Sequence, residues 1–165
     1  EKFFSNNYYL LLTGSVFDSE YEGADGVRRN TAFNNGYVVN FLGGREWKIG
    51  SKKQHALTFD MKVTTAGGRY YTPVDLPASQ AAGEEILNDN LAFSERFDPY
   101  FRLDLKFGFQ LNSPNKKLSQ QFFLDLQNIT GYENIFDRRY NDLTGEVNTV
   151  FQSGFFPDLL YRIQF

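Results

Sequence analysis

The sequence of 165 residues lacks cysteine and contains only one histidine, one tryptophan and one methionine. The absence of cysteine excludes disulfide bonds and thiolate metal sites. With His55 as the only histidine, the sequence supports neither a histidine-based catalytic triad nor a zinc site. Asp137, Asp142 and Glu146 do not follow the ligand spacing of a calcium-binding EF-hand. We therefore expect no metal ion, no cofactor and no enzymatic activity.

Long hydrophobic runs are missing as well. No stretch reaches the roughly 18 consecutive apolar residues of a transmembrane helix, and residues 1–5 lack the apolar core of a signal peptide. The net charge of -3 gives no basic field, which argues against nucleic acid as a partner. We expect the chain to be a processed product or a fragment of a longer protein, with residues 1–165 forming one domain or part of one.

Aromatic residues are abundant: 18 phenylalanines and 10 tyrosines make up most of an 18% aromatic fraction. These residues suit a pleated sheet or the boundary of a membrane. Apolar and polar residues also alternate along about six stretches, which predicts long β-strands. The alternation predicts strands at about 8–19, 32–47, 57–64, 101–111 and 118–127, and a last strand that is interrupted near Pro157 and ends at Phe165. Gly43 and Gly44 predict a bulge or bend in the second strand.

The predicted connections alternate in length. Long polar segments at about 20–31, 67–99 and 130–146 alternate with short turns at 50–54 and 112–117, and residues 79–87 are expected to form a short helix. In an antiparallel meander every second connection emerges at the same end. All long loops are therefore expected at one end and all tight turns at the other, which is the layout of an outer-membrane β-barrel.

Strand length and charge agree with a barrel. About a dozen residues, at a rise of roughly 3.3 Å and a tilt of about 40°, cover close to 30 Å. Aromatic residues are expected near strand ends, as barrel girdles require: Tyr8, Phe33, Trp47, Tyr100, Phe101 and Phe165. Six charged residues in mid-strand are predicted to face a wet lumen, although a soluble sandwich would expose them on its outer surface: Asp60, Lys62, Arg102, Asp104, Lys106 and Asp125. About six strands do not close a barrel, whose smallest ordinary form has about eight.

Six runs together resemble the C-terminal barrel segment of TonB-dependent outer-membrane receptors, over nearly the whole chain. They are YYLLLTGSVFDS with YEG (8–23), RNTAFN (29–34), AGGRYYTPVDL (66–76), DPYFRLD (98–104), LDLQNIT (124–130) and YRIQF (161–165). The resemblance implies a barrel of about 22 strands, of which these are the last six, with a plug domain and a TonB-contacting segment that this chain lacks. It also implies a bacterial outer-membrane location and the import of a scarce nutrient: an iron chelate, a cobalamin or an oligosaccharide.

The resemblance implies partners and sites too. The partners are outer-membrane lipid, the remaining barrel strands, the plug, TonB and the barrel-assembly machinery. The last strand, with Leu159, Tyr161, Ile163 and Phe165, is similar to the signal that this machinery reads, although Phe165 could simply anchor a membrane interface.

Four residues in the longest loop are candidate ligand contacts: Arg69, Tyr70, Tyr71 and Asp75. Aromatic rings and a cation suit sugars or anionic chelates, and the alternative is that these side chains fold the loop on itself. Two other functions remain open for the chain. One is a pore or structural barrel made by chain association, and the other is an outer-membrane enzyme.

Overall fold

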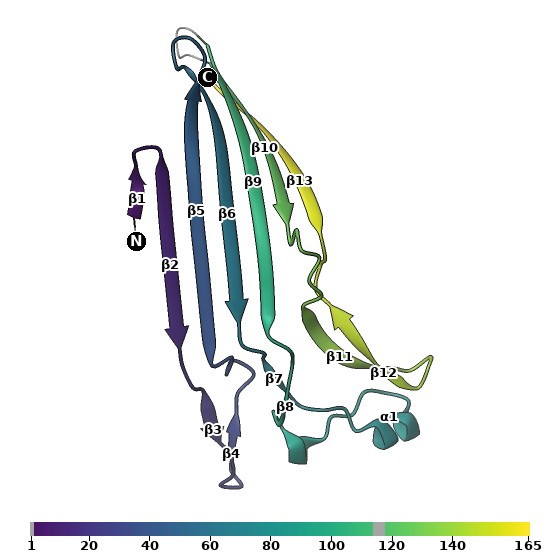
Figure 1. The fold of residues 1–165 in the computed structure, drawn as a ribbon. Helices are drawn as coiled ribbons and strands as arrows, with labels where there is room; N and C mark the ends of the chain where they lie inside the picture. The colour runs from purple at the N-terminus through teal and green to yellow at the C-terminus, as the bar shows by residue number, and fades with distance from the viewer. Residues whose placement is uncertain (1, 114–117) are drawn as a thin grey trace.

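The structure is a computed structural model that describes residues 2–113 and 118–165. Its main element is an antiparallel sheet of seven strands, which confirms the all-β fold (Figure 1). The order in the sheet is β1 (Lys2–Ser5), β2 (Tyr8–Val16), β5 (Tyr37–Ile49), β6 (His55–Ala66), β9 (Tyr100–Asn112), β10 (Ser119–Gln127) and β13 (Phe156–Gln164). The six predicted strands are all present and are neighbours in chain order. The short edge strand β1 was not predicted.

Three local expectations about these strands were wrong. The second strand begins at Tyr37, so Phe33 lies in the connection before it and is 79% exposed. Pairing of β5 with β2 and β6 continues through Gly43 and Gly44 without a shift in register, so there is no bulge. The last strand runs through Pro157, which pairs with Leu126. An edge strand tolerates proline because its missing N–H group need not pair with a neighbour.

The alternation of long and short connections is confirmed. Figure 1 shows the tight turns at one end of the sheet, which we call the turn end, and the long connections at the other, the loop end. The predicted turn at 112–117 lies partly outside the described residues, because 114–117 are not described.

The long connections contain short strands of their own, which were not predicted. Each holds a two-stranded antiparallel sheet: β3 (Glu20–Glu22) with β4 (Arg28–Asn30), β7 (Tyr70–Tyr71) with β8 (Glu95–Arg96), and β11 (Ile135–Asn141) with β12 (Glu146–Phe151). The predicted helix at 79–87 is displaced: α1 spans Leu76–Ala82 and is followed by the 3-10 turn η1 (Asp89–Leu91). The helix begins early because Asp75 caps its first turn, and it ends at Gly83, whose φ of 72° suits glycine.

Register divides the side chains of the sheet into two faces. Trp47, Leu57, Phe109, Phe122 and Tyr161 form one row across five neighbouring strands. Rows of this kind make up what we call the apolar face, and the residues between them make up the polar face.

The sheet is a single layer. Within the described residues no other element covers the long strands (Figure 1). Only three apolar side chains there are buried, Ala56, Ala66 and Phe97, and large ones of the apolar face stay open to the outside, with Phe107 44% and Leu159 79% exposed. The apolar face therefore lacks the second layer that a folded domain ordinarily packs against it.

No helix in the described part of the chain has the length and apolar character needed to cross a membrane.

Candidate functional site

The six charged residues assigned to one face by alternation, Asp60, Lys62, Arg102, Asp104, Lys106 and Asp125, do lie on the polar face. Lys106 of β9 stands between Asp60 of β6 and Asp125 of β10 in directly opposed positions, and Lys62 is opposite Asp104. Opposite charges side by side across strands stabilise a sheet by roughly 0.2 to 1 kcal/mol per pair. Across β6, β9 and β10 the polar face thus carries a ladder of alternating charge, which ends at β13, where Asp158 is opposite Asp125. That it lines a lumen remains a prediction.

A hydrogen-bonded network around Arg102 lies at the loop end of this ladder. Arg102 Nε lies 2.7 Å from Oδ1 of Asp104, and Arg102 Nη2 donates to Oε1 of Gln127 at 2.9 Å. The same Asp104 oxygen accepts the backbone N–H of Asn128 at 2.8 Å. These contacts hold Arg102 in place and tie the chain leaving β10 to β9.

Phe123 is the apolar residue that β10 places on the polar face, and Gly108 explains how it fits there. A Cβ atom at Gly108 would lie 2.8 Å from two carbon atoms of the Phe123 ring, so the ring occupies the space above this glycine. Lys106 Nζ lies 4.7 Å from the centre of the same ring, a cation–π contact. The phenylalanine is therefore covered by its neighbours although it sits among polar side chains.

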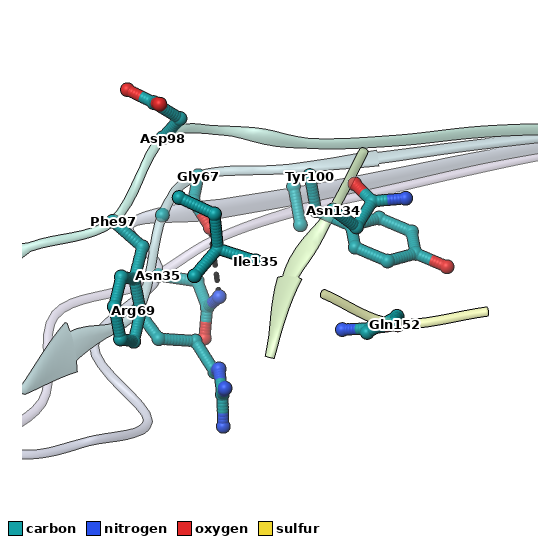
Figure 2. A pocket seen from close by; sticks show the side chains of 11 residues that line it. Asn35, Gly67, Arg69, Phe97, Asp98, Tyr100, Asn134, Ile135 and Gln152 are labelled. Atoms are coloured by element: carbon teal, nitrogen blue, oxygen red, sulfur yellow. Dashed lines mark hydrogen bonds between the residues drawn. The ribbon is translucent and has the colours of Figure 1, made fainter. Parts of the chain in front are cut away.

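A small cavity of about 120 Å³ lies at the loop end, where β6 and β9 leave the sheet. Figure 2 shows Arg69, Phe97, Tyr100 and Asn134 around it. Glycine is required at 67 and 68, since Cβ atoms there would lie 1.8 Å from the Asn35 carbonyl oxygen and 1.7 Å from that of Phe97. Three chain segments can approach closely only because these two residues have no side chain.

A wider hollow of about 650 Å³ adjoins this cavity on the polar face, and we call it the loop-end hollow. Its lining residues include Arg69, Arg102, Tyr100, Phe151 and Gln152. The two guanidinium groups each have one protein acceptor or more and still have N–H donors to spare. Arginine binds carboxylate and phosphate groups well, so the hollow has the chemistry to hold an anionic ligand beside aromatic rings.

Of the four candidate contacts in the longest loop, the structure brings only Arg69 to the loop-end hollow. Arg69 lies over the Phe97 ring at 5.8 Å and donates to the Phe136 carbonyl oxygen. Tyr70 lies under Arg96, with 5.3 Å from the guanidinium carbon to the ring centre. Asp75 accepts the Ala78 N–H at 3.1 Å as the helix cap.

Tyr71, the remaining candidate, stacks on Phe97 with ring centres 4.1 Å apart, and Arg138 Nη1 donates to its hydroxyl at 2.7 Å. Burial raises the pKa of this hydroxyl, against the opposing effect of the Arg138 charge. All four candidates therefore have partners within the chain, and ligand contact by any of them remains a prediction.

The residues of the predicted assembly signal lie along the edge of the sheet. Leu159, Tyr161 and Ile163 belong to the apolar face, and Phe165 follows β13 with 99% of its surface exposed. Tyr161 stacks on Phe122 at 4.7 Å and donates to Oε1 of Gln120 at 2.9 Å. Among the described strands β13 pairs only with β10, so its outer edge has no partner there.

Sequence reasoning missed Asn134 and Gln152, which line both the cavity and the loop-end hollow. Isolated polar residues in a loop carry no periodic signal that could identify them. No family model, curated protein or solved structure matches the chain.

Proposed function

We propose that this chain forms part of the wall of a transmembrane β-barrel in a bacterial outer membrane. The observation that carries the proposal is the apolar face, which runs across six long strands without a second layer above it. Soluble monomers rarely expose apolar patches of more than a few hundred Å². Lipid would cover this face, and water inside the barrel would solvate the ladder of charges on the other.

The dimensions of the strands support the same proposal. β5, β6 and β9 have 12 or 13 residues each. At a rise of about 3.3 Å and a tilt of about 40° they extend roughly 30 Å, against an apolar band of about 25 Å in such barrels. Ordinary globular strands are about half as long.

The barrel, we propose further, belongs to a TonB-dependent receptor that imports a scarce nutrient: an iron chelate, a cobalamin or an oligosaccharide. This part of the proposal is based on the resemblance of the sequence to such receptors. The loop-end hollow supports it, because Arg69 and Arg102 beside Tyr100 and Phe151 suit an anionic chelate.

Single cysteines provide a direct test of the two faces, since the chain contains no other cysteine. Leu105 and Lys106 are adjacent near the middle of β9 and point to opposite faces. In outer-membrane vesicles, a water-soluble maleimide should label Lys106→Cys and leave Leu105→Cys unreacted until the membrane is dissolved in detergent. Equal labelling of both variants in intact vesicles would overturn the barrel.

Uptake measurements test the receptor. Cells without the gene should take up less of one of three radiolabelled probes, ferric citrate, cyanocobalamin or maltohexaose, and the intact gene should restore that uptake. In the restored cells Arg69→Ala should weaken uptake of that probe. Unchanged uptake of all three probes would overturn the receptor while leaving the barrel in place.

A further inference from the structure

Arg45 is the one charged side chain, among Asp, Glu, Lys and Arg, that the six long strands place on the apolar face. It stands opposite Tyr8 on β2 and Phe59 on β6. Within the described residues no ion pair or side-chain hydrogen bond involves Arg45, and its guanidinium carbon lies 5.3 Å from the centre of the Trp47 ring. The described residues therefore supply a ring for this cation and no counter-ion.

A hollow of about 440 Å³ opens beside Arg45 on the same face. Gly43, the preceding residue of this face on β5, lines the hollow but is itself buried, because Leu10 and Phe41 close over it: a Cβ atom there would lie 3.0 Å from Leu10 Cδ2 and 3.2 Å from the Phe41 ring. Around it stand Leu10, Phe41, Phe59 and Met61, with Arg45 among the lining residues. Its volume falls within the range of about 300 to 1,000 Å³ that is usual for small-molecule sites. The hollow thus combines an apolar floor with one cation.

The position of Arg45 along β5 indicates how deep in the membrane the site would lie. Arg45 is four residues before Ile49, where β5 ends at the turn end. Those residues span roughly 10 Å of a wall about 30 Å high. Trp47, whose ring contacts the Arg45 guanidinium group, is nearer to the turn end, so this group is directed toward the membrane interface at that end. Arginines on lipid-facing surfaces direct their charge to the nearest interface in this way.

We infer that this hollow binds an anionic glycerophospholipid of the leaflet at the turn end. The lipid phosphate pairs with the Arg45 guanidinium beside Trp47, and an acyl chain lies in the hollow along Leu10, Phe41 and Met61. Charge complementarity identifies the occupant, since a cation in an apolar setting is costly without a counter-ion and none of the described residues supplies one. The inference rests on the proposed function, because only a membrane-embedded apolar face meets lipid.

Trp47 makes the site measurable, because it is the only tryptophan of the chain. Bromine atoms on a lipid acyl chain quench a tryptophan that they contact. The full chain is placed in vesicles of phosphatidylcholine that contain an equal fraction of brominated phosphatidylglycerol or of brominated phosphatidylcholine. We expect stronger quenching of Trp47 by the anionic lipid than by the neutral one.

Substitutions test whether Arg45 causes the stronger quenching by the anionic lipid. Arg45→Gln should abolish the difference between the two lipids, and Arg45→Lys should retain part of it. Lys62→Gln is the matched control, since it removes the same charge from the polar face of the adjacent strand. It should leave the preference unchanged.

The possible outcomes separate the two proposals. Equal quenching by both lipids would overturn the lipid site and leave the barrel standing. A preference that Lys62→Gln abolishes as fully as Arg45→Gln would also overturn the site, because general attraction to the charged protein would then explain it. If neither lipid quenches Trp47, lipid does not cover the apolar face. That result would overturn both the proposed barrel and the lipid site.

Discussion

The Tyr9 hydroxyl of β2 donates a hydrogen bond of 2.9 Å to Oδ1 of Asp60 on β6, across the intervening strand β5. The residue between them on β5 is Gly44. A Cβ atom there would lie 2.1 Å from the same carboxylate oxygen and 2.3 Å from the Tyr9 ring. The bond between the two outer strands thus depends on a missing side chain, and it links the first long strand to the charge ladder.

Gly44→Ala should therefore destabilise the sheet by about 1 to 3 kcal/mol, because the new methyl group forces both Tyr9 and Asp60 to move. The measurement is the midpoint of urea unfolding in detergent. Gly14→Ala on β2 is the control, since no heavy atom lies within 4 Å of a Cβ atom at that position. Equal midpoints for the two variants would show that the Tyr9–Asp60 hydrogen bond does not require a residue without a side chain at position 44.

The Asn134 side chain takes the place of β10 as the hydrogen-bonding partner of β9 at Phe101, which lies beyond the end of the pairing between β9 and β10. Its Nδ2 donates to the Phe101 carbonyl oxygen at 2.8 Å, and its Oδ1 accepts the Phe101 N–H at 2.9 Å. The side chain is buried, with 4% exposed, so Asn134→Ala leaves both backbone groups unpaired at a cost of roughly 1 to 3 kcal/mol. We expect faster hydrogen exchange at the Phe101 amide. Asn148→Ala, at an exposed position on β12, should leave that rate unchanged, and a normal rate in both variants would contradict the prediction.

The hairpin of β3 and β4 should respond to acid through Asp25. Two hydrogen bonds from Arg29 and one from the Val27 N–H lower the pKa of this carboxyl from 3.8 to about 2. A carboxyl with a lowered pKa in the folded state contributes fully above its unfolded pKa, and its contribution is lost as the pH falls through the folded value. Amide protection in the hairpin should therefore hold from pH 7 to about 4 and decline toward pH 2.

Asp25→Asn should reduce this protection above about pH 4, where the Asp25 carboxylate contributes fully, and should flatten the dependence on acid. Glu22→Gln, at the end of β3, is the matched control and should behave like the original chain. A decline between pH 7 and 5 would mean that some other group controls the hairpin.

Alternation was enough to predict the six long strands because each keeps one face apolar. The prediction failed where that signal is absent. The hairpins β3–β4 and β11–β12 are mostly exposed on both sides, so no period of two marks them. Pro157 suggested an interruption that the edge position of β13 makes unnecessary.

Within the candidate sites the sequence predicted which residues share a face, but not what they contact. Counting by two from Phe41 places Gly43, Arg45 and Trp47 together, so the arginine on the apolar face was open to prediction from the start. That Phe123 covers Gly108 depends on the register between β9 and β10, which alternation within single strands does not fix.

The strongest consequence of the proposed barrel concerns neighbouring residues on β9. Leu105 stands between Met61 and Leu126 on the apolar face. An arginine there would meet the middle of the bilayer, so Leu105→Arg should lower stability by about 2 to 4 kcal/mol. Lys106→Leu removes a charge that is directly opposite Asp60 and Asp125 in the register of the strands, which should cost only about 1 kcal/mol. Heat-modifiable migration on gels and urea unfolding of outer-membrane protein would measure both. Similar tolerance at the two positions would mean that lipid does not cover the face of Leu105.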